Sequence, residues 1–274
     1  MKKIIVPVDF SKTANNAAVF AGNLANFYNA DVWLYHSYEL PVSIGEFTYP
    51  LFDVAEMQVA AMHELEMLAE NTQQHIRSNV VFNLKAEMGL IVDGLASFCE
   101  AIKPDLVIMG LTGKDALTKL VVGSNTIKAI HEIKYPILVI PPMAEFIPVR
   151  KIGFACDYKQ VKETTPLSLL KKIVTDFNAE LHILNIDFEN RNFSPEEVHE
   201  SFLLDDMLEG MKANYHSIEA EDISTGINWF ADKEKLDWVV VVPKKHTLVQ
   251  KIFSRSQSNQ LIYHTHVPVL CIHQ

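Results

Sequence analysis

Four residues between positions 110 and 124 have the types and spacing of a loop that could bind an anion: Gly110, Gly113, Gly123 and Ser124. They follow an apolar run at 105–109 that is typical of a buried strand. A glycine after a strand permits positive φ and lets a ligand approach without meeting a Cβ. A Gly-Ser pair that opens a helix offers free N–H groups, the positive end of the helix dipole and a capping hydroxyl. The pattern predicts a phosphate-binding loop; the alternative is that the glycines only make turns.

Two motifs together resemble the universal stress protein family. The glycine spacing at 110–124 is similar to that family's ATP-binding signature, and the segment 4–11 (IIVPVDFS) is similar to its opening strand. The resemblance implies a Rossmann-like, adenine-nucleotide-hydrolase-like domain with a five-stranded parallel sheet in the order 3-2-1-4-5. It also implies binding of ATP or another adenine nucleotide, with Mg²⁺ arriving on the phosphates.

The resemblance places the ligand at the carboxyl ends of strands one to four. Asp9 is implied as a polar contact at the adenosine end or near the metal; the alternative is an aspartate that stabilises the turn around Ser11. The residues implied to line the adenine pocket are Ser37, Met88, Gly89 and Met109. For the two methionines the alternative is ordinary core packing. The full set of predicted binding residues is Pro7, Val8, Asp9, Ser37, Met88, Gly89, Met109, Gly110, Gly113, Gly123, Ser124 and Asn125.

Three positions depart from the family pattern. Thr112 stands where the family commonly has His or Arg, Ala116 where it has Gly, and Asn125 where it has Val. We expect these changes to alter how tightly the loop closes, and therefore the affinity for nucleotide more than the existence of the site.

The loop does not carry a recognisable catalytic machinery. It is not a Walker A loop, because Gly110 and Gly113 are too close together and Lys114 is followed by Asp115. There is no nucleophile elbow and no Ser–His–Asp pattern. The histidines and cysteines lack metal-ligand spacing. We predict no catalytic residues, no protein-bound metal site and no enzyme, with at most slow, incidental ATP hydrolysis.

Composition bounds the class of protein. The chain has 274 residues, 49% of them apolar and 21% charged, with a net charge of −10. This is typical of a globular protein with room for two domains, and it disfavours nonspecific nucleic-acid binding, which needs a basic surface. With no membrane span and no signal-peptide pattern, the sequence predicts a cytoplasmic protein without a membrane partner. The odd number of cysteines predicts reduced, buried thiols.

The elements that must position the loop alternate between strand and helix. Strands are expected at 3–8, 31–38, 80–87, 105–109 and 137–140, with helices after Ser11, from about 53 to 77, from 89–91 to 102, and before Tyr135. Such alternation predicts a parallel sheet with right-handed crossovers and helices on both faces. In the implied strand order, Asp9 and Gly110 both lie at the topological switch point.

The pattern then repeats after a proline-punctuated connector. The segments 151–157, 237–242 and 266–272 repeat 3–9, 105–110 and 134–140. This internal duplication predicts two tandem domains of the same α/β fold, 1–145 and 146–274. Opposite Gly110, Gly113 and Gly123 stand Val242, Lys245 and Arg255, so the second copy is predicted to have lost the nucleotide site. Its basic loop at 244–255 is either a solvated surface or a site for a smaller anion.

The leading hypothesis is an ATP-binding stress regulator or sensor; the alternative is a protein–protein interaction module of the same fold that binds no nucleotide. An ATP-pyrophosphatase relative is disfavoured because no glycine–serine-rich loop follows the first strand. Family members pair through their last strands, so the resemblance implies an intramolecular pseudo-dimer in which 137–140 lies antiparallel to 269–272. The sequence leaves open whether two chains also form a homodimer.

Overall fold

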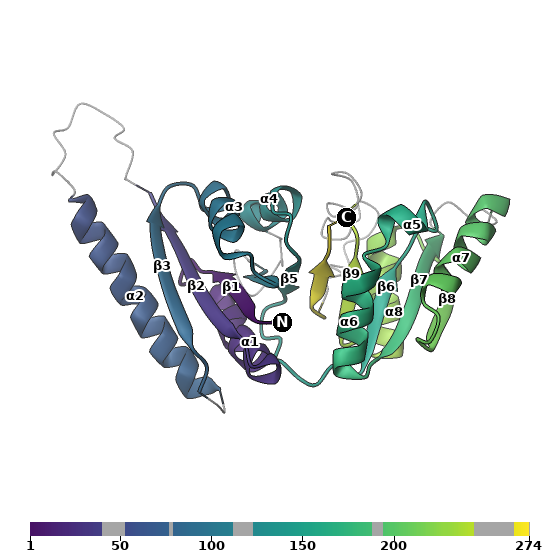
Figure 1. Ribbon diagram of the computed structural model, residues 1–274, viewed down its shortest axis with the longest axis horizontal. Coiled ribbons are helices and arrows are strands. Elements are labelled where there is room, and N and C mark those ends of the chain that lie inside the picture. The colour runs from purple at the N-terminus through teal and green to yellow at the C-terminus, as the bar shows by residue number, and fades with distance from the viewer. Residues whose placement is uncertain (40–52, 77–78, 112–122, 188–193, 244–265, 274) are drawn as a thin grey trace. The chain divides into compact units, whose positions relative to one another are not determined.

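A computed structural model describes residues 1–39, 53–76, 79–111, 123–187, 194–243 and 266–273 (Figure 1). The chain divides into two compact units. Unit one contains Met1–Thr112 and Gly123–Ile137, and unit two contains Leu138–Gln274. The predicted domain boundary at 145/146 lies in the connector beyond this division and stays a prediction.

The first half of the chain has the predicted alternation of strands and helices. Its elements are β1 (Lys3–Pro7), α1 (Lys12–Tyr28), β2 (Asp31–Tyr38), α2 (Val54–His75), β3 (Phe82–Met88), α3 (Ile91–Ile102), β4 (Leu106–Gly110), α4 (Ser124–Glu132) and β5 (Ile137–Ile140). The strand order is β3-β2-β1-β4-β5, and the pairs β1–β2, β1–β4 and β2–β3 are parallel. The predicted α/β fold and strand order are confirmed.

The strand bounds differ slightly from the predicted ones. β1 ends at Pro7, one residue before the predicted end, and β3 begins at Phe82 rather than at residue 80. The helix after Ser11 begins as predicted, because the Ser11 hydroxyl accepts a hydrogen bond from the Ala14 N–H over 3.2 Å. The same helix ends at Asn29, whose left-handed backbone (φ 49°) is one that asparagine tolerates.

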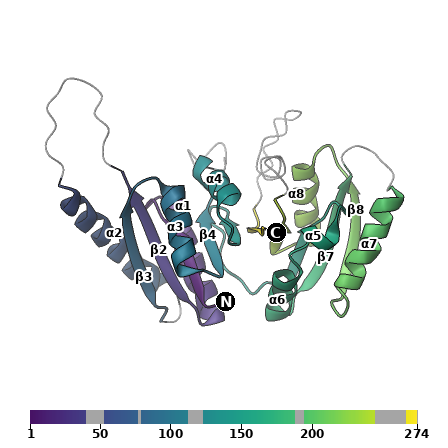
Figure 2. The ribbon, with the colours of Figure 1, turned by 45° about the horizontal axis from the view of Figure 1, so that its top comes forward.

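The direction of the crossovers fixes which helices share a face. The chain moves outward from β1 to β2 and β3, so right-handed connections place α1 and α2 on one face. It then returns to the other side of β1 for β4 and β5, which places α3 and α4 on the opposite face. α3 and α4 lie beside one another in both ribbon views (Figures 1 and 2).

The part of unit two that follows β5 repeats this architecture. Its elements are β6 (Lys151–Ala155), α5 (Val161–Thr164), α6 (Leu167–Phe177), β7 (Glu180–Asp187), α7 (Pro195–Met207), β8 (Ala213–Glu219), α8 (Ile223–Glu234), β9 (Trp238–Val241) and β10 (Val269–Cys271). Read from its β8 edge, the sheet has the order β8-β7-β6-β9-β10, which is the same 3-2-1-4-5 pattern when the strands are counted from β6. All of its described strand pairs are parallel.

A polar clamp holds the amino end of the sheet in unit one. The backbone N–H groups of Lys2 and Lys3 both donate to Oδ2 of Asp105, over 2.6 and 3.0 Å. The Lys3 ammonium reaches back to the Ile102 carbonyl at the end of α3, over 3.1 Å. Because Asp105 precedes β4 and Lys3 begins β1, this clamp joins the starts of the two central strands.

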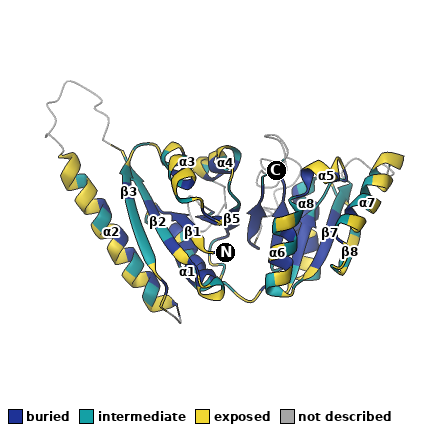
Figure 3. Cartoon of the chain, viewed as in Figure 1, coloured by how far each residue is buried: buried dark blue, intermediate teal, exposed yellow. Residues whose placement is uncertain are grey.

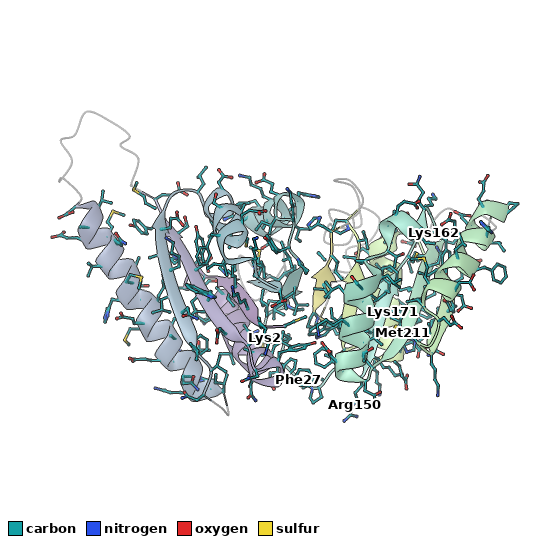
Figure 4. All side chains as sticks on the ribbon, in the orientation of Figure 1. Lys2, Phe27, Arg150, Lys162, Lys171 and Met211 are labelled. Atoms are coloured by element: carbon teal, nitrogen blue, oxygen red, sulfur yellow. The ribbon has the colours of Figure 1, made fainter. Side chains whose placement is uncertain are left out.

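Unit two has the same clamp at the same place. The N–H groups of Arg150 and Lys151 donate to Oδ2 of Asp237 over 2.6 and 2.9 Å, and the Lys151 ammonium reaches the Glu234 carbonyl over 3.1 Å. Figure 4 labels Lys2 and Arg150, which hold equivalent positions in the two clamps. The duplication read from the sequence therefore extends to individual hydrogen bonds.

The strands and the inner faces of the helices form the cores of the units (Figure 3). Cys99 and Cys271 are fully buried, and burial raises the pKa of each thiol to about 12, so both are protonated at neutral pH. The prediction of reduced, buried thiols is confirmed for these two and wrong for Cys156, which is reduced but only half-buried. Within the described residues, none of the helices is long and apolar enough to span a membrane.

Candidate nucleotide site at the carboxyl edge of unit one

The predicted site residues gather where the central strands of unit one end. β1 and β4 are parallel neighbours, with Ile4 opposite Leu106 and Ile5 opposite Val107. Their carboxyl ends therefore lie at the same edge of the sheet, and Asp9 and Gly110 follow there. Since α1 and α4, the helices that follow β1 and β4, lie on opposite faces of the sheet, this edge is a topological switch point, the place at which α/β sheets bind ligands.

The segment after β1 is held in a tight turn. Asp9 is exposed, and its Oδ1 accepts the Ser11 N–H over 3.1 Å. Phe10 between them has a left-handed backbone, with φ 61°. This is the turn role given above as the alternative for Asp9. Only one carboxylate oxygen is used in the turn, so Oδ2 is left to face solvent or a ligand.

The close packing of α1 against the end of β4 requires a glycine at position 110. A Cβ built on Gly110 would lie 2.6 Å from the carbonyl oxygen of Thr13 and 3.2 Å from the backbone nitrogen of Ala14. The first turn of α1 therefore approaches the end of β4 so closely that only glycine fits. This packing role was not foreseen in the sequence, where ligand access was the reason given for the glycine.

Val8 and His36 fix the course of the chain as it leaves the sheet. Val8 is buried; its N–H donates to the Tyr35 carbonyl, and its carbonyl accepts from Nδ1 of His36, both over 2.8 Å. The His36 ring also packs on Phe10, with 4.5 Å between the ring centroids. His36 was missed in the sequence, because only the fold brings β2 beside the end of β1.

The residues predicted to line an adenine pocket come from the ends of β2, β3 and β4. The Ser37 hydroxyl donates to the Gly89 carbonyl, and the Gly89 N–H donates to the Tyr38 carbonyl over 3.0 Å. Gly89 has φ +139°, which side-chain-bearing residues rarely adopt. Met88 is 49% exposed, and Met109 is 6% exposed. Core packing therefore accounts for Met109 but not for Met88.

The helix that follows the glycine loop begins one residue earlier than a cap at Ser124 predicts. Gly123 is the N-cap and Ser124 the first helical residue, so the Ser124 hydroxyl is not the cap. No side chain caps this helix, and both Ser124 and Asn125 are exposed. Of the other helices that begin at this edge, α1 is capped by Ser11 and α2 by Asp53, whereas α3, with N-cap Leu90, also lacks a side-chain cap. Of the two uncapped helices, α4 is the one that follows the glycine spacing, and its N–H groups are available to an anion.

Charged side chains bind α3 and α4 to each other at this edge. Lys128, one turn into α4, donates to Oδ1 of Asp93 in the first turn of α3 over 3.0 Å. The hydrogen bond to Asp93 is the main cause of the raised pKa of Lys128. Lys128 is thus paired with Asp93 and also lies 3.8 Å from Glu132 of its own helix.

Gly113, Thr112 and Ala116 lie outside the described residues, as does the basic loop at 244–255 of unit two. Of the other predicted binding residues, Pro7, Val8, Asp9, Met109 and Gly110 lie at the ends of β1 and β4, and Ser37, Met88 and Gly89 at the ends of β2 and β3. Among the described residues, no three His, Cys, Asp or Glu side chains are placed to hold a metal ion.

Comparison with known proteins identifies the family. Residues 1–141 match the model of the universal stress protein family, which is more than half of the chain. This chain belongs to the universal stress protein family. A curated universal stress protein of Methanocaldococcus jannaschii is 27% identical over 144 residues, which cover 51% of this chain and 81% of the relative.

Solved universal stress proteins share the fold over the whole length. The crystal structure of one from Archaeoglobus fulgidus matches with a TM-score of 0.70 at 17% identity, covering 99% of this chain and 98% of that one. A putative universal stress protein of Pseudomonas aeruginosa matches with a TM-score of 0.60 at 14% identity, covering 100% and 93%. At these identities the likeness concerns the fold, including the presence of both repeats.

Proposed function

We propose that this universal stress protein binds ATP, or another adenine nucleotide, at the carboxyl edge of unit one and acts as a nucleotide-dependent regulator rather than as an enzyme. The observation that supports this most is the uncapped start of α4 at the edge where β1 and β4 end. The glycine spacing at 110–124 leads into that helix. The two features together provide backbone N–H groups for the phosphates.

In this proposal the other predicted residues have defined roles. Oδ2 of Asp9 faces the ribose or a Mg²⁺ ion carried by the phosphates, while Oδ1 keeps the turn. Ser37, Met88 and Gly89 form one side of the adenine pocket. Gly110 shapes the edge by admitting α1. No residue is assigned to bond cleavage, because the hydroxyls of Ser11, Thr13 and Ser37 at this edge are bonded to one another or to a backbone carbonyl and not to a general base.

An added charge at the start of α4 tests the phosphate contact without disturbing the fold. Asn125→Asp places a carboxylate in the first turn, where it favours the helix but repels phosphate. We expect ATP affinity to fall at least about tenfold while the melting temperature is kept. Gln74→Glu, the same charge change near the end of α2 at the opposite edge of the sheet, is the control.

Asp9→Asn separates the two roles of Asp9, because asparagine keeps an oxygen for the Ser11 N–H but removes the charge. We expect weaker binding of ATP with Mg²⁺ at unchanged stability. The parent protein should bind about one ATP per chain and release nucleotide on denaturation, and Gly113→Arg should abolish binding. If none of these proteins binds ATP at millimolar concentration, the nucleotide role is wrong and the interaction-module alternative replaces it.

We also propose that the two repeats form an intramolecular pseudo-dimer, as the family resemblance implies. Solution scattering that shows two separated lobes would contradict this arrangement.

A further inference from the structure

A pocket lies in unit two between α7 and β8, and Tyr158 from the turn after β6 also lines it. The two elements lie side by side in both ribbon views (Figures 1 and 2). The pocket has a volume of about 370 Å³, which suits a small organic molecule. The proposed nucleotide function does not use it.

The pocket exists because the repeat is shortened at this point. α2 has 22 residues and buries four of them, whereas α7 has 13 and buries only Leu204. The strand pairings make Ser217 of β8 equivalent to Ala86 of β3. Ala86 is 6% exposed, whereas Ser217 is exposed. The face that α2 covers in unit one is thus open in unit two.

One face of α7 supplies one wall of the pocket. Val198, Ser201, Phe202 and Asp205 recur at the spacing of successive helical turns, and all four line it. Phe202 is 66% exposed, although it is a large apolar residue. An aromatic side chain held open to solvent on the wall of a pocket gives a ligand apolar surface to cover.

Two tyrosines form the opposite wall. Tyr158 follows β6 and is 5% exposed, and Tyr215 lies on β8 and is 37% exposed. Burial, and then a hydrogen bond to Asp205, raise the pKa of Tyr215, so its hydroxyl is protonated and donates to that carboxylate. With Phe202 the pocket has three aromatic rings and one carboxylate held among them.

The charged groups of the lining determine which sign of charge a ligand should carry. Among the described lining residues there is no lysine or arginine. His216 also lines the pocket, and burial lowers its pKa, so it is neutral at pH 7. Outside the lining, α7 carries Glu196, Glu197 and Asp206, and α5, which packs against α7, carries Lys162, so Asp205 is the charged group of the lining itself. The pocket therefore favours a cation and disfavours an anion.

We propose that this pocket binds a small aromatic ligand that carries a protonated amine. Its ring would pack among Phe202, Tyr158 and Tyr215, and its ammonium group would pair with Asp205 while also facing the aromatic rings. This would make unit two a receptor for an organic cation, which is a different chemistry from the anionic nucleotide proposed for unit one.

Tryptamine is the probe for this proposal, with indole-3-propionate as an anion of similar size and shape. Both are titrated into the full chain by calorimetry or by ligand-observed NMR. We expect tryptamine to bind with a Kd of about 1 mM or tighter and indole-3-propionate not to bind. Asp205→Asn should weaken tryptamine binding roughly tenfold, and Phe202→Ala should weaken it as well.

Asp206→Asn is the matched control, because it removes the neighbouring charge from the same helix without changing the lining. Both Asp205 and Asp206 are exposed, and a thermal melt of each variant shows that the fold is kept. The proposal is overturned if tryptamine fails to bind at about 10 mM, if the anion binds equally well, or if the two asparagine variants lose the same affinity.

Discussion

The two units share the amino ends of their sheets and differ at the carboxyl ends. Lys3 with Asp105, and Lys151 with Asp237, form the same clamp, with corresponding hydrogen bonds that agree within 0.1 Å. At the other end, Gly110 is matched by Val242. The clamp is common to both units, whereas the residues at the carboxyl ends of the strands differ between them.

The turn after the first strand of each unit is also common to both. Asp157 accepts the Lys159 N–H over 3.2 Å, as Asp9 accepts the Ser11 N–H. Tyr158, like Phe10, has positive φ. Because unit two keeps this turn although its glycines are lost, the aspartate is needed for the turn in both units. Any nucleotide contact of Asp9 is added to that role.

The helices that come after this turn differ between the units. In unit one α1 begins at once and its first turn lies against Gly110. In unit two the short helix α5 lies between the turn and the long helix α6, which begins only after Pro166. The N–H of Val161 in α5 donates to the Glu200 carboxylate over 2.7 Å. With no long helix beginning directly after the turn, Val242 is accommodated at 8% exposure.

Gly110→Val should therefore have the largest effect. It gives unit one the residue of unit two at a point where a Cβ would lie 2.6 Å from a backbone oxygen of α1. We expect a loss of about 1–3 kcal/mol of unfolding free energy, measured by urea denaturation. Val242→Ala is the control for unit two, where no such clash exists. An unchanged midpoint for Gly110→Val would refute the packing role of the glycine.

Substitutions in the two clamps should have the next largest effect on stability. Asp105→Asn and Asp237→Asn each weaken two hydrogen bonds to a carboxylate. Because Asp105 is exposed and Asp237 is only half-buried, we expect a modest cost of about 1 kcal/mol each. The comparison predicts equal effects in the two units and additivity in the double variant. Denaturation midpoints that differ strongly between the two single variants would show that the clamps are not equivalent.

A smaller effect should distinguish the units by pH. The strand pairings put His182 of unit two at the position that Trp33 holds in unit one. In unit one the ring of Phe98 packs on Trp33, with 5.5 Å between the ring centroids. In unit two the equivalent Phe230 packs on His182, with 6.1 Å between the centroids. His182 Nδ1 lies 3.1 Å from His216 Nε2. Burial, and then the charge of a nearby lysine, lower the pKa of His182; burial and His182 lower that of His216.

The sign of this effect follows from linkage. Below about pH 6.5 the unfolded chain takes up protons on these histidines that the folded chain does not, so stability falls as the pH drops through and below that value. Unfolding free energies measured between pH 7.5 and 5.5 should show this loss, and His216→Asn should reduce it. A pH dependence that is identical in the variant would assign the loss to other groups.

Cysteine reactivity should show the smallest difference, with no change of fold. Burial raises the pKa of the Cys99 and Cys271 thiols to about 12, so their reactive thiolates are scarce at pH 8. Cys156, at the turn after β6, is half-buried. We expect a disulfide reagent to label Cys156 first and the other two only on unfolding. Mass spectrometry that finds Cys99 labelled first would contradict this order.

Some features of this protein follow from sequence alone because they are local or periodic. The alternation of strands and helices, the Ser11 cap and the duplication are of this kind. A further local signal was available but not used: Asn29-Ala-Asp31 and Asn178-Ala-Glu180 end α1 and α6 in the same way, each with the asparagine at φ 49°. A helix end of this type depends only on neighbouring residues.

Other features were decided only by the tertiary structure, because they depend on residues far apart in the chain. The reason for Gly110 is a helix that begins about a hundred positions earlier, and the partner of Val8 is His36 on the next strand. The pocket beside Tyr215 results from the length of α7 relative to the strand it covers. Sequence patterns locate the ends of strands and helices, but close contacts between elements arise only when packing sets the distances between them.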